Sequence, residues 1–192
     1  MARVIYYTAS SLNGFIADAS NSLDWLFAVD IAGAPDIAAF MAGMGVLVEG
    51  STTYEWVLRE EKLLENPGKW QGFYGTRPTY VFTSRELPVP DGADVRFVRG
   101  PVADALPAIM AAAGGNDVWV VGGGELAGQF LDAGALDELV ISVAPATLAG
   151  GAPLLPRGVG PDRLRLSDVA RHGQFAQLTY AVTVPGRESP QA

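Results

Sequence analysis

Three consecutive glycines between an apolar run and a helix-like segment constrain the fold of this chain more than any other feature. Residues 118–131 read VWVVGGGELAGQFL. An apolar run such as VWVV is typical of a strand that helices bury on both faces. Glycines let the backbone approach an anion closely, and the N-terminus of the following helix points N–H groups and a positive dipole end at it. The stretch therefore indicates a phosphate-binding turn or, alternatively, only a tight turn from strand to helix.

A Rossmann domain is the first interpretation to test, because Gly122, Gly124 and Ala127 satisfy its G-x-G-x-x-A fingerprint. That fingerprint should follow the first strand, and an acidic residue about 20 positions later should hold the ribose. Here several strand-like runs come earlier, and the next strand, ELVISVAP, has no acid at its far end. No Lys-Ser/Thr pair follows the glycines, which excludes a Walker loop as well.

The composition excludes several functional classes. Hydrophobic residues make up 49% of the chain and charged residues only 18%, as is typical of a globular protein. No apolar run approaches the roughly 18–20 residues that a membrane span needs, so no membrane partner is expected. The net charge of −8 argues against a nucleic-acid partner, which would select a basic surface. The first residues lack the pattern of a signal peptide, and we expect a cytoplasmic protein.

Cysteine and histidine usage narrows the chemistry further. The chain has no cysteine, which excludes disulfides, thiolate metal sites and a cysteine nucleophile. Its single histidine, His172, cannot form a multi-histidine site, so no metal is expected. A Ser-His-Asp hydrolase would have to use this one histidine, and no G-x-S-x-G elbow accompanies it.

Strand-like and helix-like runs alternate along the first three quarters of the chain. We expect strands at 3–9, 45–49, 79–84, 95–98, 117–122 and 138–145, and helices at 23–29, 35–43, 52–60, 102–113 and 125–134. Residues 10–22 and 146–162 are expected to be loops. Two longer strand-like runs, 163–171 and 174–184, are predicted to form a C-terminal antiparallel hairpin. This pattern predicts one α/β domain over residues 1–184, with a mainly parallel mixed sheet of about eight strands, and a flexible tail at 185–192.

Four segments in a fixed order carry a family resemblance. They are ASSLNGFIAD (9–18), LVEGSTTYEW (47–56), YVFTSREL (80–87) and the glycine-bearing stretch itself. This order resembles the dihydrofolate-reductase-like superfamily. Within it, the chain is most similar to the bacterial branch that contains the C-terminal reductase domain of the bifunctional riboflavin-biosynthesis deaminase–reductase. The corresponding patterns of that branch are S-L-D-G-x-I-A, G-R-x-T-Y-E, V-x-T-S and V-x-G-G-G-x-L. The resemblance spans nearly the whole chain and implies a three-layer fold of that superfamily.

The resemblance also implies an NADPH site. It assigns cofactor contacts to Ala9, Ile16, Gly50, Ser51, Thr52, Thr53, Thr83, Ser84, Arg85, Gly122, Gly123, Gly124, Glu125 and Leu126. The first two would face the nicotinamide carboxamide through their backbone. The threonines that follow Gly50 would bind the pyrophosphate from one side, and the three glycines with the next two amides would bind it from the other. Thr83 and Ser84, at the end of strand 79–84, would reach the adenosine 2′-phosphate, with Arg85 nearby.

This sequence departs from the patterns of the branch at three positions. Ser51 stands where the branch usually has an arginine, which removes a cation from the 2′-phosphate region and leaves open whether NADPH or NADH is preferred. Arg85 or Arg77 could compensate. Asn13 replaces the common aspartate of S-L-D-G, and Glu125 occupies a position that can be arginine in dihydrofolate reductases.

The substrate contact is the least constrained part of the site. Asp36 aligns with the carboxylate that hydrogen-bonds the pterin in dihydrofolate reductases, and its alternative role is a helix-start charge that the dipole favours. We expect an NADPH-dependent reductase that transfers hydride to a small heterocyclic substrate, similar to 5-amino-6-(5-phosphoribosylamino)uracil reductases. The alternatives are a dihydrofolate or pteridine reductase and a nucleotide-binding protein without turnover.

The organisation of the protein can also be anticipated. No zinc-deaminase segment, with H-x-E and P-C-x-x-C, precedes the reductase-like region, so we expect a stand-alone reductase. Members of the branch are commonly dimers, and the long apolar C-terminal strands would supply a surface for pairing. We therefore expect a homodimer.

Overall fold

A mainly parallel sheet of eight strands forms the centre of the protein, and the computed structural model describes residues 2–183 of the chain. The strands are β1 (Val4–Ser11), β3 (Met44–Gly50), β4 (Thr79–Phe82), β5 (Val95–Val98), β6 (Asp117–Gly122), β7 (Glu138–Ala144), β9 (Leu164–His172) and β10 (Phe175–Val182). Their spatial order is β5-β4-β3-β6-β1-β7-β10-β9. The strands from β5 to β7 in this order run parallel to one another, whereas β10 is antiparallel to both β7 and β9.

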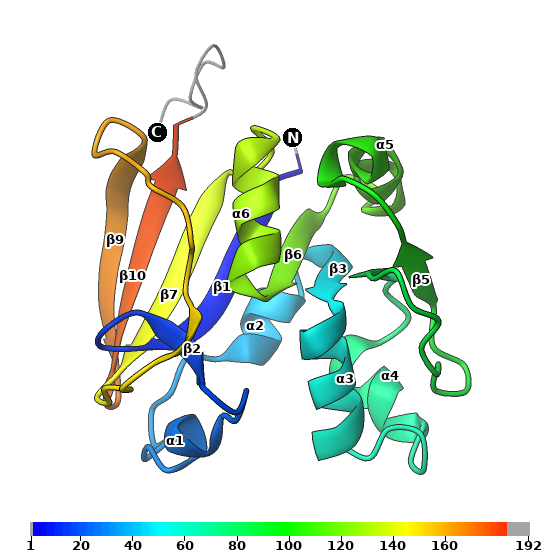
Figure 1. The fold of residues 1–192 in the computed structure, drawn as a ribbon, viewed down its shortest axis with the longest axis horizontal. Helices are drawn as coiled ribbons and strands as arrows, with labels where there is room; N and C mark the ends of the chain where they lie inside the picture. The colour runs from blue at the N-terminus through cyan, green and yellow to red at the C-terminus, as the bar shows by residue number, and fades with distance from the viewer. Residues whose placement is uncertain (1, 184–192) are drawn as a thin grey trace.

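Helices cover both faces of the sheet (Figure 1). One face packs against α5 (Val102–Ala112) and α6 (Gly124–Asp132). The other packs against α2 (Ile37–Met41), α3 (Ser51–Glu60) and α4 (Gly68–Tyr74). A short helix, α1 (Asp24–Phe27), lies outside these layers. The mainly parallel α/β sheet predicted from the alternating runs and the three-layer fold implied by the family resemblance are both confirmed.

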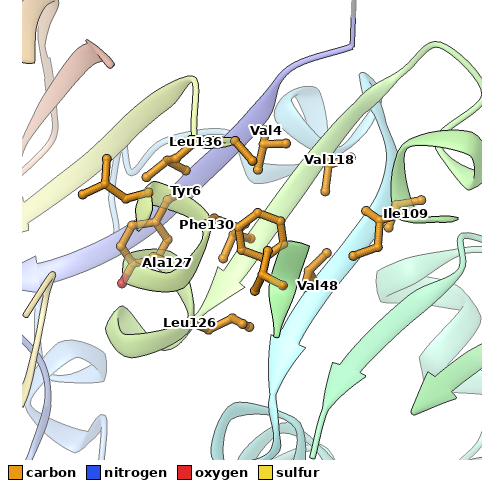
Figure 2. Packing of buried hydrophobic residues seen from close by; sticks show 14 of the residues in the cluster. Val4, Tyr6, Val48, Ile109, Val118, Leu126, Ala127, Phe130 and Leu136 are labelled. Atoms are coloured by element: carbon orange, nitrogen blue, oxygen red, sulfur yellow. The ribbon is translucent and has the colours of Figure 1, made fainter. Parts of the chain in front are cut away.

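The larger core lies between the sheet and helices α5 and α6 (Figure 2). Strand residues contribute with a period of two, as Val118 and Val120 do on β6, while Leu126 and Phe130 of α6 are one helical turn apart. Phe130 and Val120 are completely buried. This packing fixes the N-terminus of α6 directly beyond the carboxyl end of β6, and the candidate site lies there.

Three elements lie in segments where the sequence indicated none. Strands β2 (Phe15–Asp18) and β8 (Gly151–Pro153) pair antiparallel in a separate two-stranded sheet, within segments predicted to be loops. Each is stabilised by a partner more than a hundred positions away, so neither shows a local pattern. Helix α4 contains two glycines, which lower its intrinsic helix propensity. Packing of its buried side chains Trp70 and Tyr74, only 1% and 7% exposed, stabilises the helix instead.

The C-terminal hairpin is confirmed, with β9 and β10 joined at Gly173 in a left-handed conformation. The predicted tail, 185–192, lies outside the described residues. Within the part of the chain that the structure describes, no helix has the length and apolar character needed to cross a membrane.

Candidate functional site

A cavity of about 690 Å³ opens at the carboxyl edge of the parallel strands. β3 and β6 end there, α3 and α6 begin there, and β2 and β8 form the opposite wall. Figure 1 shows the first turns of α3 and α6 near each other at this edge. The cavity lining includes these sequence-predicted residues: Ile16, Gly50, Ser51, Thr52, Thr53, Gly122, Gly123, Gly124, Glu125 and Leu126. Segments that are far apart in the chain therefore contribute to one shared region.

Two helix N-termini without side-chain caps converge on this cavity. Gly50 is the N-cap of α3 and Gly123 is the N-cap of α6, and neither position provides a side chain to bind the first N–H groups. The two turns approach closely: a Cβ atom on Gly50 would lie 3.7 Å from the carbonyl oxygen of Gly122. The peptide bond between Gly122 and Gly123 is cis. Uncapped N–H groups and aligned dipoles from two sides can stabilise an anionic group placed between them.

A second cavity of about 280 Å³ adjoins the first, because Phe82 and Gln129 line both. Thr83 and Ser84, which the resemblance assigns to the adenosine 2′-phosphate, line this cavity. Arg99 lines it too and was not identified from the sequence. Its guanidinium has no ion-pair partner among residues 2–183. The only feature of the sequence that could have pointed to Arg99 was its position directly after strand β5, because ligands usually bind at the carboxyl ends of the strands in such sheets.

The two arginines expected to compensate for Ser51 are bound elsewhere. Arg85 pairs with Glu55 of α3, with 3.0 Å between the Nη1 and Oε1 atoms. Arg77 donates hydrogen bonds to the carbonyl oxygens of Met44, at 2.6 Å, and Tyr74, at 3.1 Å. Neither arginine lines either of the two cavities.

Asp36 and Ala9 also lie outside the described cavity linings. Asp36 is the N-cap of α2, where its Oδ1 atom accepts hydrogen bonds from the backbone N–H groups of Ala38, at 2.9 Å, and Ala39, at 3.2 Å. This is the helix-start role that the sequence left as the alternative, and a substrate contact by Asp36 stays a prediction. Ala9 lies in β1 next to Thr8, which does line the larger cavity.

Glu125 brings a negative charge to the edge of the larger cavity, and Arg157 balances it. Two nitrogens of Arg157 donate to the Glu125 carboxylate at 2.9 and 2.8 Å, and a third donates to Asp132 at 2.8 Å. Hydrogen bonding to Arg157 lowers the pKa of the Glu125 carboxyl group. Arg157 lies in a long Gly/Pro loop, and no local pattern in the sequence connects it with this site.

The fold is that of the dihydrofolate reductases. The structure superposes on dihydrofolate reductase from Enterococcus faecalis with a TM-score of 0.57 and 16% identity, covering 94% of this chain and 96% of that one. The chain itself belongs to the RibD C-terminal domain family, whose model matches residues 2–178.

Two relatives are similar to this chain over nearly their full length. The uncharacterised protein YwjB of Bacillus subtilis (strain 168) is 32% identical over 178 residues, covering 93% of this chain and 97% of the relative. The crystal structure of a putative riboflavin biosynthesis protein from Shewanella sp. PV-4 is 28% identical, with a TM-score of 0.76, covering 95% of this chain and 99% of that one.

Proposed function

We propose that this protein is an NADPH-dependent reductase of the riboflavin-pathway type, which transfers a hydride to a small heterocyclic substrate. The convergence of the α3 and α6 N-termini on one glycine-lined cavity carries the proposal. The cavity, about 690 Å³, falls within the roughly 300–1,000 Å³ usual for small-molecule and cofactor sites. Membership of the RibD C-terminal domain family supports an oxidoreductase activity.

The residues present fit the three charged or polar parts of the cofactor. The turns at Gly50 and Gly123 would bind the pyrophosphate through backbone N–H groups. Arg99, with Thr83 and Ser84, would bind the adenosine 2′-phosphate in the adjoining cavity and so replace the arginine that is absent at position 51. The nicotinamide would then lie at the opposite end, beside β1 and β2.

The protein contributes binding and orientation to this chemistry. Bound NADPH would supply a hydride to the substrate, and one proton balances the reaction, leaving NADP⁺ and the reduced product. Ile16 and the backbone of the glycine turns would hold the cofactor in place, and Thr8 would face its nicotinamide end. Water at the cavity mouth would supply the proton, because Glu125, the one ionisable side chain in the described lining, is bound to Arg157.

Fluorescence titration with NADPH and NADH tests the proposal. We expect NADPH to bind at sub-millimolar concentration and more tightly than NADH. Gly123→Asp should abolish binding, because a carboxylate there would enter the pyrophosphate site, whereas the control Gly68→Asp, at the exposed start of α4, should bind as wild type does. Absence of NADPH binding to the wild type would overturn the proposal. Binding without NADPH oxidation by any acceptor would instead support a nucleotide-binding protein without turnover.

Dihydrofolate reduction has less support from the site. The described cavity lining contains no carboxylate free to hydrogen-bond a pterin, since Asp36 caps α2 and Glu125 is paired. We therefore propose a reductase of the RibD type in preference to a dihydrofolate reductase.

A further inference from the structure

The orientation of the cofactor determines which part of the larger cavity receives the substrate, so any assignment of the substrate rests on the proposed function. Arg99 places the 2′-phosphate in the smaller cavity, and the glycine turns place the pyrophosphate between α3 and α6. The remaining part of the larger cavity lies past the nicotinamide. It is lined by Asn21 and Leu23, just before α1, and by Trp56 and Val57, one turn along α3.

This substrate end is apolar and contains a flat aromatic wall. Trp56 and Val57 follow Thr53 on the same face of α3, so the lining changes from hydroxyl groups to hydrocarbon within one turn. The Trp56 ring stacks on Phe27 of α1, with 6.0 Å between centroids and 18° between planes. Phe27 is 63% exposed, although it belongs to a residue type that is usually buried. Asn21 supplies an uncharged polar group.

Cations are missing from this end of the site. No Lys, Arg or His is among the described residues that line the larger cavity. Arg59, the next cation along α3, pairs with Glu60 at 3.0 Å, and Arg157 is held by Glu125 and Asp132. A phosphate group enclosed here would lose hydration without gaining a charged partner, which is a large free-energy cost. The two helix N-termini could not replace the cation, because the cofactor pyrophosphate uses them.

We propose that the hydride acceptor is an uncharged, planar ring compound without a phosphate group, bound against Trp56. The reaction would take one hydride from NADPH to an electrophilic carbon of the ring and one proton from water, and would yield NADP⁺ and the reduced ring. This substrate differs from the phosphoribosyl compounds that riboflavin-pathway reductases use, while NADPH stays the hydride donor.

Binding to the NADP⁺-loaded protein tests this assignment, with matched pairs that differ only in a phosphate group. Riboflavin and FMN form one pair, and 5-amino-6-ribosylaminouracil and its 5′-phosphate form another; lumazine is a further neutral ring. We expect a neutral ring to bind at least about tenfold more tightly than its phosphorylated counterpart. Trp56→Ala should weaken that binding by about tenfold or more, as loss of an aromatic stacking partner does, while Trp56→Phe should restore most of it.

NADPH titration of the same samples keeps the two proposals distinguishable, and Phe73→Ala, at an exposed aromatic residue of α4, is the matched control. If NADPH binds but the phosphorylated members are preferred, or if no neutral ring binds, the substrate assignment is wrong and the reductase proposal stands. If NADPH itself does not bind, the reductase proposal fails. Unchanged ring binding in Trp56→Ala would also contradict the assignment.

Discussion

At the scale of single residues, Glu49 lies in surroundings that disfavour its charge. It is completely buried on β3, directly before the α3 turn, and neither carboxylate oxygen has a partner in hydrogen-bonding geometry among the described residues. Burial raises the pKa of Glu49 from its ordinary value of 4.5 to about 7, against a smaller opposing effect of the Tyr74 hydroxyl. The folded protein therefore retains a proton that an unfolded chain would lose in mildly acidic solution.

We expect this proton to make stability depend on pH. Between a pH of about 4.5 and about 7 the folded state binds more protons than the unfolded state, so the free energy of unfolding should fall as pH rises, by up to about 3 kcal/mol. Glu49→Gln should remove this slope and be more stable than wild type at pH 8. Urea denaturation at pH 5, 6, 7 and 8 measures both effects. Glu65→Gln, at an exposed glutamate, should follow the wild-type profile, and a wild-type slope in Glu49→Gln would contradict the prediction.

Arg99 is the residue on which cofactor preference should depend. Arg99→Gln removes a charge-assisted contact worth roughly 1.5–3 kcal/mol, so the Kd for NADPH should rise by about tenfold or more. The Kd for NADH, which lacks the 2′-phosphate, should not change. Isothermal titration of both cofactors checks this, with Arg59→Gln as a control that keeps the α3 surface otherwise intact. Equal losses for the two cofactors would contradict the assignment of Arg99 to the 2′-phosphate.

At the scale of elements, the start of α6 depends on a close approach to β8. A Cβ atom on Gly124 would overlap the carbonyl oxygen of Pro153 and lie only 2.5 Å from that of Leu154. Backbone atoms cannot move aside as a flexible side chain can. The contact therefore links the glycine turn to the two-stranded sheet that forms the opposite wall of the cavity.

Gly124→Ala should consequently destabilise the protein by about 1–3 kcal/mol, the usual cost of overpacking. The matched control is Gly72→Ala in α4, where an added Cβ meets no atom within 4 Å and the helix should gain a few tenths of a kcal/mol or more. Thermal denaturation of both variants is the measurement. Equal stability of the two variants would show that β8 can shift without cost.

The ion pairs of Arg157 connect α6 with the loop after β8 and should matter for binding more than for stability. Arg157→Gln leaves Glu125 uncompensated beside the pyrophosphate site, and we expect NADPH to bind several-fold more weakly through like-charge repulsion. Stability should change little, because Glu125 and Asp132 are largely exposed.

The double variant Arg157→Gln/Glu125→Gln should recover most of the lost affinity, since the uncompensated charge is then gone. NADPH titration of the two single variants and the double variant gives the coupling free energy. If the double variant does not regain NADPH affinity, Arg157 must affect binding in some way other than by balancing the charge of Glu125.

At the scale of the whole molecule, one face of the sheet continues beyond the helices that cover it. A register shift opposite Thr179 and Tyr180 places Leu166 and Val169 of β9 on the same face, and they are 50% and 59% exposed. Figure 1 shows α6 over β1 and β6, and no helix over β9 and β10. β9 is also an edge strand, with unpaired backbone groups along its outer side.

We therefore expect a homodimer that covers this face, as the family resemblance implies. Val169→Asp should shift the protein from dimer to monomer in sedimentation velocity, because the substitution buries a charge in the expected interface. Phe73→Asp, at an exposed apolar residue of α4, should leave the dimer unchanged. A monomeric wild type at micromolar concentration would show the prediction to be wrong.

Much of the architecture could be read from local patterns. The strand at 95–98 and the strand at 117–122 were predicted with the bounds that the structure shows. The glycine turn was correctly placed between a buried strand and a helix. Strands β2 and β8 could not be predicted, because each is short and acquires its hydrogen bonds from the other across more than a hundred positions.

The candidate site, like the fold, could be predicted from the sequence only in part. Residues within the four motif segments, such as Thr53 and Gly123, line one cavity, and their contacts with a cofactor stay a prediction. Arg99 and Arg157 were missed, because what they do depends on which side chains the fold brings near them. Arg85, which was expected to replace the missing arginine at position 51, does not line the described cavities. Its guanidinium is bound instead by Glu55 of α3, 30 positions away in the sequence.

The sequence by itself determined the order of most elements, the α/β class of the fold and the glycine turn that could receive an anion, because periodicity and backbone freedom are local properties. Only the tertiary structure decided which charges remain available to a ligand. Arg99 is without an ion pair within the described residues, whereas Arg85, Arg77 and Arg157 are bound by other groups. Pairing depends on distances in space, and the packing of the sheet and helices sets those distances.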